Sequence, residues 1–238
     1  MSLPNRALIF DVDGTLVDSN DAQAAAWAEA LRDFEIDREV DAIVPLVALP
    51  PDKLLPRLAG VTPDSQLGRR ISERRRELFR TVYLDHVTAF PGVRELFERL
   101  RDDGVLRAVA SAARCDDVEA LLDIANVREL VDHRACLEDI SWPRLDVLDA
   151  AFSRLGTDAP ATLLVGDSPF DIEAAHTVGI GTIALRTGGW EDRDLDEALA
   201  IFDDPRAMLA AYEAHEWDWP APRPPKPGAR LPAGHSLR

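Results

Sequence analysis

The chain is poor in lysine, in cysteine and in long apolar runs. Of its 238 residues only Lys53 and Lys226 are lysines, so chemistry that needs a primary amine has two candidates. Cys115 and Cys136 are too few for a disulfide framework and lack the paired spacing of a metal site, so we interpret them as reduced and without a functional role. No apolar run approaches the roughly 18 residues of a membrane span, and residues 1–10 lack the layout of a signal peptide. The sequence therefore predicts a cytoplasmic protein with no membrane partner.

The shortage of positive charge excludes a second class of partner. There are 27 basic and 43 acidic residues, which gives a net charge of −16 at pH 7. A surface this negative disfavours binding to nucleic acid or to anionic lipid, and an anionic substrate would need a local cation. With 46% hydrophobic and 29% charged residues, the chain has the composition of a globular protein.

Apolar patterning predicts strands that alternate with helices. Residues 7–10 form a short continuous apolar run, which is typical of a buried strand, and further strands are predicted at residues 105–110, 161–165 and 180–185. Apolar residues at helical spacing lie between these runs, notably over residues 93–100. This alternation predicts an α/β protein with a doubly wound, Rossmann-like parallel sheet that helices cover on both faces.

One long segment interrupts the alternation. Apolar residues at helical spacing occupy residues 21–34 and again residues 71–84, with prolines between them. We therefore expect a small helical insertion within the α/β core. The predicted parts are a core at residues 1–16 and 83–215, a helical cap at residues 17–82, and a proline-rich tail, extended or disordered, at residues 216–238.

Polar side chains follow three of the predicted strands. Asp11 and Asp13 come after the first strand, Ser111 after the second, and Asp167 and Asp171 after the third. Ligands of open parallel sheets bind beyond the carboxyl ends of the strands, so we expect these residues to converge. Clustered carboxylates repel one another unless they share a proton or a cation, and oxygen ligands suit Mg²⁺. The four aspartates are therefore candidate ligands of Mg²⁺, which would also offset the charge of a phosphate.

Taken together, these segments resemble the haloacid dehalogenase-like superfamily, in particular its phosphatases with a helical cap inserted after the first motif. Residues 11–19 resemble the first motif, Ser111 the second, and residues 166–171 the fourth, and the likeness extends over about residues 7–205. Family members that cleave carbon–halogen bonds typically lack an acid at the position of Asp13. The presence of Asp13 therefore favours phosphate chemistry.

The resemblance implies a role for each of these residues. Asp11 would be the nucleophile that forms an aspartyl-phosphate, and Asp13 the acid and base that protonates the leaving oxygen and then activates water. Ser111 would bind a phosphoryl oxygen. Asp11, the carbonyl of Asp13 and Asp167 would hold Mg²⁺, with Asp171 in support, although Asp171 equally suits the first turn of a helix. The implied activity is the Mg²⁺-dependent hydrolysis of a small phosphorylated metabolite.

The third motif departs from the family pattern. The family usually places a lysine before a proline, where its ammonium bridges the nucleophile and the phosphate, and here Trp142 stands before Pro143. Either another cation replaces this lysine or the activity is reduced. We predict that Arg144 binds the phosphate and partly compensates, although Arg144 could equally be a solvated residue at the start of a helix. Other candidate cations are Arg114, Arg134 and Lys53.

The predicted cap carries further polar residues. Gln23 and Lys53 could face the metal or could be plain surface residues. An arginine cluster is a candidate anion gate, but Glu73 and Glu77 accompany it, which favours a solvated helix face. The cluster comprises Arg69, Arg70, Arg74, Arg75, Arg76 and Arg80.

Two other functions fit the same residues. A phosphoryl-transferring mutase would use Asp11 and Asp13 but shield the aspartyl-phosphate from water. A non-catalytic protein that binds a phosphorylated ligand is the alternative that Trp142 suggests. The sequence names neither the metabolite nor the oligomeric state.

Overall fold

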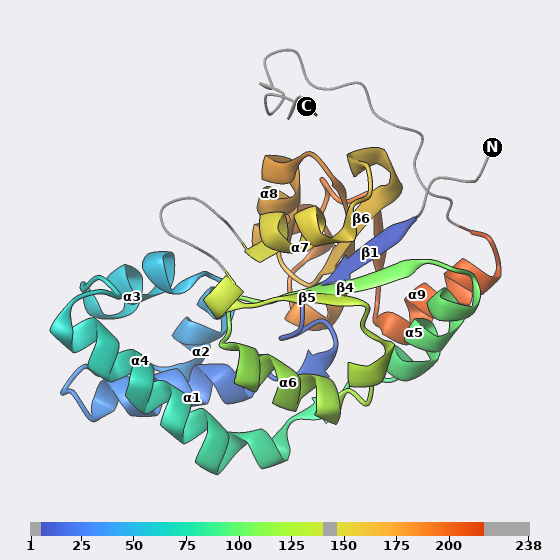
Figure 1. The fold of residues 1–238 in the computed structure, drawn as a ribbon. Coiled ribbons are helices and arrows are strands. Elements are labelled where there is room, and N and C mark those ends of the chain that lie inside the picture. The colour runs from blue at the N-terminus through green and yellow to red at the C-terminus, as the bar shows by residue number, and fades with distance from the viewer. Residues whose placement is uncertain (1–5, 140–146, 217–238) are drawn as a thin grey trace.

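A six-stranded parallel sheet forms the centre of the protein, seen here in a computed structural model that describes residues 6–139 and 147–216 (Figure 1). The strands are β1 (Ala7–Phe10), β4 (Leu106–Ala110), β5 (His133–Ala135), β6 (Thr162–Gly166), β7 (Gly181–Leu185) and β8 (Ala200–Phe202). Their order is β5-β4-β1-β6-β7-β8, and every neighbouring pair is parallel. The chain thus builds one side of β1 first and then the other, which confirms the predicted doubly wound sheet.

Helices cover both faces of the sheet, as predicted. One face carries α5 (Val93–Asp102), α6 (Cys115–Ile124) and α9 (Pro205–Glu213), and the other carries α7 (Val147–Leu155) and α8 (Pro169–Val178). Alternate residues of β1 point to opposite faces. Phe10 belongs to the first core and packs on Phe97 with ring centroids 4.6 Å apart, whereas Ile9 belongs to the second. Burial on both faces explains why β1 is a continuous apolar run.

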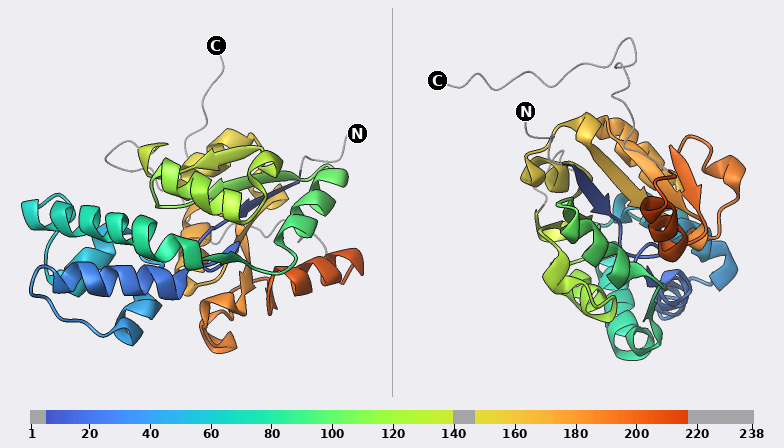
Figure 2. Two further views of the ribbon diagram at one scale, coloured as in Figure 1. Left: turned by 90° about the horizontal axis from the view of Figure 1, so that it is seen from below. Right: turned by 90° about the vertical axis from the view of Figure 1, so that its right-hand side faces the viewer.

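Four helices form a separate layer beyond the end of β1, which we call the helical unit (Figures 1 and 2). They are α1 (Asn20–Arg32), α2 (Val40–Ile43), α3 (Pro51–Ala59) and α4 (Gln66–Leu78). The unit has its own apolar cluster, in which Trp27, Leu31 and Ile71 are buried. The chain enters and leaves it through two short antiparallel strands, β2 (Val17–Asp18) and β3 (Thr88–Ala89). Entry and exit therefore lie side by side.

The two cysteines are joined, so their interpretation as reduced residues was wrong. Cys115 begins α6 and Cys136 follows β5, and a disulfide links them with their Cα atoms 5.2 Å apart. The spacing of 21 residues gave no hint of this pair, because it depends on the pairing of β4 with β5, in which Ala110 lies opposite Ala135. The bond ties the loop after Ser111 to the end of β5.

Two predictions concern the C-terminal tail and the absence of a membrane span. The predicted tail lies outside them, apart from Glu216. Within the described ranges, no helix combines the length and the apolar character that crossing a membrane requires. The cytoplasmic location stays a prediction.

Candidate active site

The sheet brings the three predicted motifs to one edge. β1 pairs in parallel register with β4 on one side and with β6 on the other. Asp11 directly follows β1, and its backbone N–H donates to the carbonyl of Val165 at 2.9 Å. Ser111 directly follows β4, and Asp167 directly follows β6. Asp11, Ser111 and Asp167 therefore gather at the carboxyl ends of three adjacent strands.

Asp13 is held by two residues of the segment that follows it. The chain turns sharply after β1, and Gly14 adopts a φ of 74°, a conformation that favours glycine. Ser19 Oγ donates to Asp13 Oδ1 at 2.6 Å, and Gln23 Nε2 donates to the same oxygen at 2.9 Å. Both bonds use Oδ1, so the orientation of the carboxylate is fixed while Oδ2 stays outside both bonds.

Asp167 is the most deeply buried of the four aspartates, with 1% of its surface exposed. Asn20 Nδ2 donates to its Oδ2 at 2.9 Å, across 147 residues of sequence. Gly14 and Gly188 pack directly against it, and a Cβ at either position would overlap the Asp167 carboxylate. The absence of a side chain at these two glycines leaves room for this acid.

Asp171 caps the start of α8. Its Oδ2 accepts hydrogen bonds from the backbone N–H of Ser168 at 2.9 Å and from Ser168 Oγ at 2.6 Å. The Ser168 hydroxyl in turn lies 3.4 Å from the backbone nitrogen of Asp171, which completes a capping box. The observed contacts of Asp171 are therefore those of a residue in the first turn of a helix. Its support of a metal ion stays a prediction.

Burial and mutual repulsion shape the acidity of this cluster. Burial, followed by the nearby charges of Asp171, Asp167 and Asp13, raises the pKa of Asp11 well above its ordinary value. Burial and the charge of Asp171 also raise the pKa of Asp167. Carboxylates and a backbone carbonyl are hard oxygen ligands, and their gathering in a partly buried site fits Mg²⁺. A divalent cation would relieve the repulsion that raises these pKa values.

Ser111 is oriented by the neighbouring strand. Its backbone N–H donates to the carbonyl of Ala135 at 3.1 Å, and its Oγ accepts from the backbone N–H of Ala113 at 3.2 Å. The side chain is buried, with 4% of the residue exposed. An accepting hydroxyl keeps its own hydrogen to donate, which suits a phosphoryl oxygen.

Of the four candidate replacements for the missing lysine, one lies outside the described residues, two form ion pairs and one is exposed. Trp142 and Arg144 lie outside the described residues, so the role of Arg144 stays a prediction. Arg114 lies in an ion pair with Glu138 at 3.1 Å, and Arg134 pairs with Glu119. The fourth candidate, Lys53, is exposed on α3.

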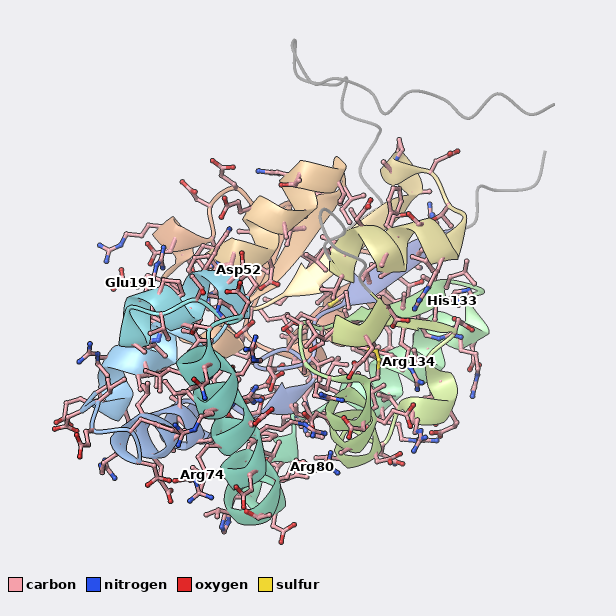
Figure 3. All side chains as sticks on the ribbon, turned by 60° about the vertical axis from the view of Figure 1, so that its left-hand side comes forward. Asp52, Arg74, Arg80, His133, Arg134 and Glu191 are labelled. Carbon is pink, nitrogen blue, oxygen red and sulfur yellow. A yellow bond between two sulfur atoms is a disulfide. The ribbon has the colours of Figure 1, made fainter. Side chains whose placement is uncertain are left out.

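The arginines of α4, and Arg80 in the helical turn that follows it (Phe79–Tyr83), point in different directions rather than forming one solvated face. Arg74 pairs with Asp33 at 2.7 Å and remains within the helical unit. Arg76 and Arg80 reach across to α6, where both bind Asp117, at 2.8 and 2.9 Å. Figure 3 shows Arg74 and Arg80 on different sides of α4. Two of these arginines therefore connect the helical unit to the sheet domain.

Arg75 points toward the aspartate cluster. Its Nη1 donates to Gln23 Oε1 at 3.0 Å, and Gln23 in turn binds Asp13. The structure thus supports a place at the site for Gln23. Sequence reasoning missed Ser19 and Asn20, and it named Arg75 only as one of six arginines of a candidate anion gate. The first two directly follow the first motif, whereas nothing in the sequence separates Arg75 from its neighbouring arginines.

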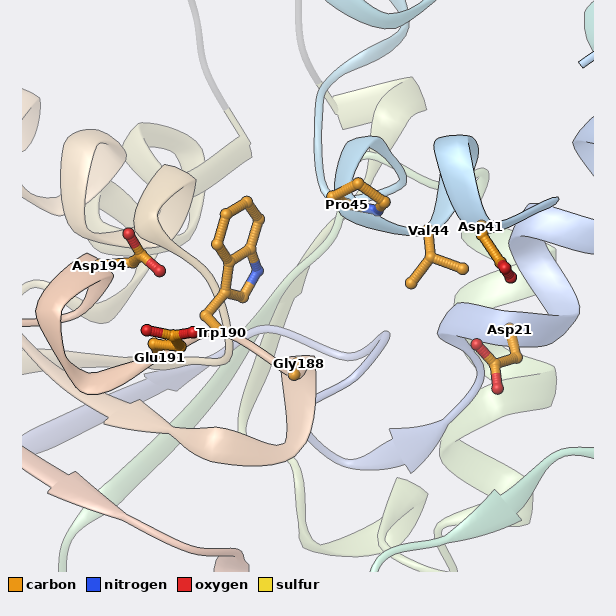
Figure 4. Close-up of a pocket in the computed structure, with 9 residues that line it drawn as sticks. Asp21, Asp41, Val44, Pro45, Gly188, Trp190, Glu191 and Asp194 are labelled. Carbon is orange, nitrogen blue, oxygen red and sulfur yellow. The ribbon is translucent and has the colours of Figure 1, made fainter. Parts of the chain in front are cut away.

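A pocket of about 490 Å³ lies between the helical unit and the loop after β7 (Figure 4). Its lining includes Asp21, Asp41, Glu191 and Asp194, so it is not suited to an anion. It adjoins the aspartate cluster through Gly188, which packs against Asp167. We therefore do not place a phosphate in it.

Comparison with known proteins connects this site to a family. The haloacid dehalogenase-like hydrolase family matches residues 8–185. The probable phosphatase IndB of Dickeya dadantii is 30% identical over 190 residues, which cover 76% of this chain and 81% of IndB. The phosphoglycolate phosphatase of Synechococcus elongatus is 30% identical over 188 residues, which cover 79% of this chain and 86% of that protein. The crystal structure of a hydrolase from Pseudomonas syringae has a TM-score of 0.80 and 26% identity, and covers 88% of this chain and 98% of that one.

The family match includes all three strand ends that carry the candidate site. It begins within β1, ahead of Asp11, and continues past Ser111 and Asp167 to the end of β7. The structural likeness covers nearly all of the neighbouring hydrolase, so the shared architecture is the whole fold rather than the sheet alone. The chain therefore belongs to the haloacid dehalogenase-like hydrolases and is an enzyme of the phosphatase type.

Proposed function

We propose that the protein is a Mg²⁺-dependent phosphatase that hydrolyses a small phosphorylated metabolite through an aspartyl-phosphate on Asp11. The observation that carries this proposal is the pairing of a nucleophile and an oriented acid at one sheet edge. Asp11 directly follows the central strand, and Asp13, two residues later, is held by Ser19 and Gln23. The phosphatases named above as relatives support the same reaction class.

The first step forms the covalent intermediate. A carboxylate oxygen of Asp11 attacks the phosphorus, and the bond between phosphorus and the leaving oxygen breaks. Asp13 gives its proton to that leaving oxygen. Because Ser19 and Gln23 both bind Oδ1, we assign the transferred proton to Oδ2 of Asp13. The products of this step are the free alcohol and the aspartyl-phosphate.

The second step returns the enzyme to its starting state. Asp13, now ionised, takes a proton from water, and the water oxygen attacks the phosphorus of the aspartyl-phosphate. The bond between phosphorus and the Asp11 oxygen breaks, which releases inorganic phosphate. The hydroxyl of Ser111 donates to a phosphoryl oxygen in both steps. Arg144 stays the predicted second donor to the phosphate.

The metal would be held by residues that follow two neighbouring strands, β1 and β6. Asp11, Asp167 and the carbonyl of Asp13 are the proposed ligands, with Asp171 in support. Mg²⁺, when bound, supplies positive charge beside the phosphoryl oxygens. Asn20 holds Asp167 by its Oδ2, which orients this proposed ligand.

The helical unit is the proposed cap of this enzyme. We take the cap as residues 17–82 and the core as residues 1–16 and 83–215. The paired strands β2 and β3 support this division, because a body whose two chain connections to the core lie side by side can move as a unit once its side-chain contacts with the core break. In the closed position the cap would exclude water, and the contact of Gln23 with Asp13 belongs to this position.

Phosphate release with and without Mg²⁺, measured over a panel of small phosphate esters, tests the proposal. The wild type should release phosphate with Mg²⁺, and Asp11→Asn should release none. Trapping of phosphate on the protein by rapid acid quench should fail in Asp11→Asn. Ligand binding without release across the panel would instead support a non-catalytic protein, and an isomerised sugar phosphate would support a mutase.

A further inference from the structure

Arg75 differs in its contacts from its neighbours Arg74 and Arg76 on α4, and from Arg80 in the helical turn that follows α4. Arg74, Arg76 and Arg80 each form ion pairs with carboxylates. Across residues 6–139 and 147–216, no ion pair involves Arg75. Its one hydrogen-bond partner there is the neutral amide of Gln23, at 3.0 Å. The positive charge of Arg75 is therefore not neutralised by a carboxylate within hydrogen-bonding distance.

The surroundings of Arg75 make this arrangement costly without a ligand. Its Nε is buried and has no hydrogen-bond partner among the described residues. Its guanidinium carbon lies 5.2 Å from the centroid of the Trp27 ring, so one face of the group is covered by an aromatic side chain. Burial lowers the pKa of Arg75, and the charges of Asp13 and Asp117 oppose this shift. Arg75 as a whole is half-buried, and a cation that is partly removed from water without a paired anion is rare unless a ligand completes it.

The position of Arg75 shows which part of a substrate it would meet. Gln23 connects the Arg75 Nη1 to Asp13 Oδ1 through two hydrogen bonds, of 3.0 and 2.9 Å. In the proposed reaction Asp13 protonates the leaving oxygen, so the leaving group lies beside Asp13. Arg75 is thus close to the leaving group.

We propose that Arg75 determines substrate specificity by binding a second anionic group on the leaving group of the substrate. This inference rests on the proposed phosphatase function and deepens it. The substrate class is a phosphate monoester whose alcohol carries a carboxylate or a further phosphate close to the ester oxygen. A guanidinium binds either group through charge-assisted hydrogen bonds. It also answers the need for a local cation that the net charge of −16 creates.

Three substrates with one two-carbon skeleton test the proposal. They are 2-phosphoglycolate, ethane-1,2-diyl bisphosphate and 2-hydroxyethyl phosphate. The leaving group is anionic in the first two and uncharged in the third. In the wild type, kcat/KM should be higher for at least one substrate with an anionic leaving group than for the substrate with an uncharged one. Arg75→Gln should lower this ratio by on the order of 10- to 100-fold, the effect of losing a hydrogen bond between charged groups. The anionic substrate that loses most identifies the carboxylate or the phosphate as the recognised group.

Matched variants separate specificity from a structural role. Arg74→Gln removes the neighbouring arginine, which pairs with Asp33, and should leave the ratio unchanged. If Arg75 only positions Gln23, then Arg75→Gln lowers kcat/KM for all three substrates alike, and the proposal fails. If Arg75→Gln does not fold, Arg75→Lys keeps a cation and should retain part of the preference.

The outcomes also distinguish this inference from the function on which it rests. A wild type that hydrolyses all three esters with equal kcat/KM overturns the role of Arg75 alone. A wild type that releases no phosphate from these esters or from p-nitrophenyl phosphate overturns the proposed function itself.

Discussion

Gln23 donates a hydrogen bond of 2.9 Å from its Nε2 to Oδ1 of Asp13, and so joins α1 of the helical unit to the loop after β1. Ser19 Oγ binds the same oxygen at 2.6 Å. A carboxylate held by two donors on one oxygen has a defined orientation, and a general acid must be oriented toward the atom that it protonates. Because of this contact, the orientation of the Asp13 carboxylate depends on where the helical unit lies.

The first prediction concerns this contact. Gln23→Leu should lower kcat for an alkyl phosphate by about 10-fold, a part of the roughly 10²- to 10⁴-fold that general acid–base catalysis supplies. The loss should be smaller for p-nitrophenyl phosphate, because p-nitrophenolate leaves with little help from an acid. Steady-state kinetics on both esters measures the difference. Equal losses on the two would contradict a role in orienting Asp13.

A second prediction concerns the ion pairs that join α4 and the helical turn after it to α6. Asp117 is buried and binds both Arg76 and Arg80, whereas its neighbour Asp116 binds the same two arginines from an exposed position. Asp117→Ala should lower the free energy of unfolding by about 1–3 kcal/mol, since Arg76 is only half-buried and Arg80 is exposed. Asp116→Ala should cost about 0–1 kcal/mol. Urea unfolding of the two variants compares them, and similar costs would count against the buried contact.

A third prediction joins pH to Mg²⁺. Burial raises the pKa of Asp11, Asp167 and Asp171 above their ordinary value of 3.8, so the folded protein keeps protons that the unfolded chain releases. Without metal, the stability that these three protonated carboxyl groups contribute is fully present below pH 3.8 and is lost as pH rises through their raised pKa values. Mg²⁺ needs the ionised carboxylates, so it should raise the melting temperature more at about pH 7.5 than at about pH 5.

Thermal melts with and without Mg²⁺ at the two pH values measure this effect. Asp167→Asn removes one proposed ligand and one ionisable group, and it should reduce the Mg²⁺-dependent rise at the higher pH. An equal rise at both pH values, in the wild type, would argue against binding by this cluster.

The central strands and the motif residues could be predicted from the sequence because local pattern determines them. Residues 7–10 are the observed β1, and the predicted strand at 180–185 differs from β7 by one residue. β5 and β8 were not predicted. Each has three residues, and at the edges of the sheet the pairing with a neighbouring strand defines them rather than a long apolar run.

The contacts of the site could be predicted less well than its position. Asp11, Ser111 and Asp167 were predicted because each directly follows a strand. Asn20 was not predicted, and Arg75 was named only as one of six arginines, because their contacts join distant segments: Asn20 meets an acid 147 residues away, and Arg75 on α4 binds Gln23 on α1, 52 residues away. Periodicity within one helix carries no information about such contacts.

A fourth prediction concerns the disulfide. A bond between residues 21 positions apart restricts the unfolded chain, so the double variant Cys115→Ser/Cys136→Ser should lower the free energy of unfolding by about 3 kcal/mol. Dithiothreitol should lower the stability of the wild type by a similar amount and leave the double variant unchanged. Urea unfolding with and without the reductant measures both. A wild type that does not respond to reductant would show that the bond is absent in solution.

The last prediction concerns two adjacent glycines after β7. A Cβ on Gly188 would lie 2.9 Å from Cγ of Asp167 and would displace this proposed ligand, whereas Gly189 has no heavy atom within 4 Å of its Cβ position. Gly188→Ala should therefore weaken Mg²⁺ binding by roughly 10-fold or more, as changes next to a metal ligand do. Gly189→Ala should cost stability, about 1–2 kcal/mol, because φ is 77° there, but it should leave Mg²⁺ affinity intact. Titration of phosphate release with Mg²⁺, beside urea unfolding, separates the two effects. If both variants lowered stability and neither changed the Mg²⁺ dependence, Asp167 would not be a ligand held in place by this glycine.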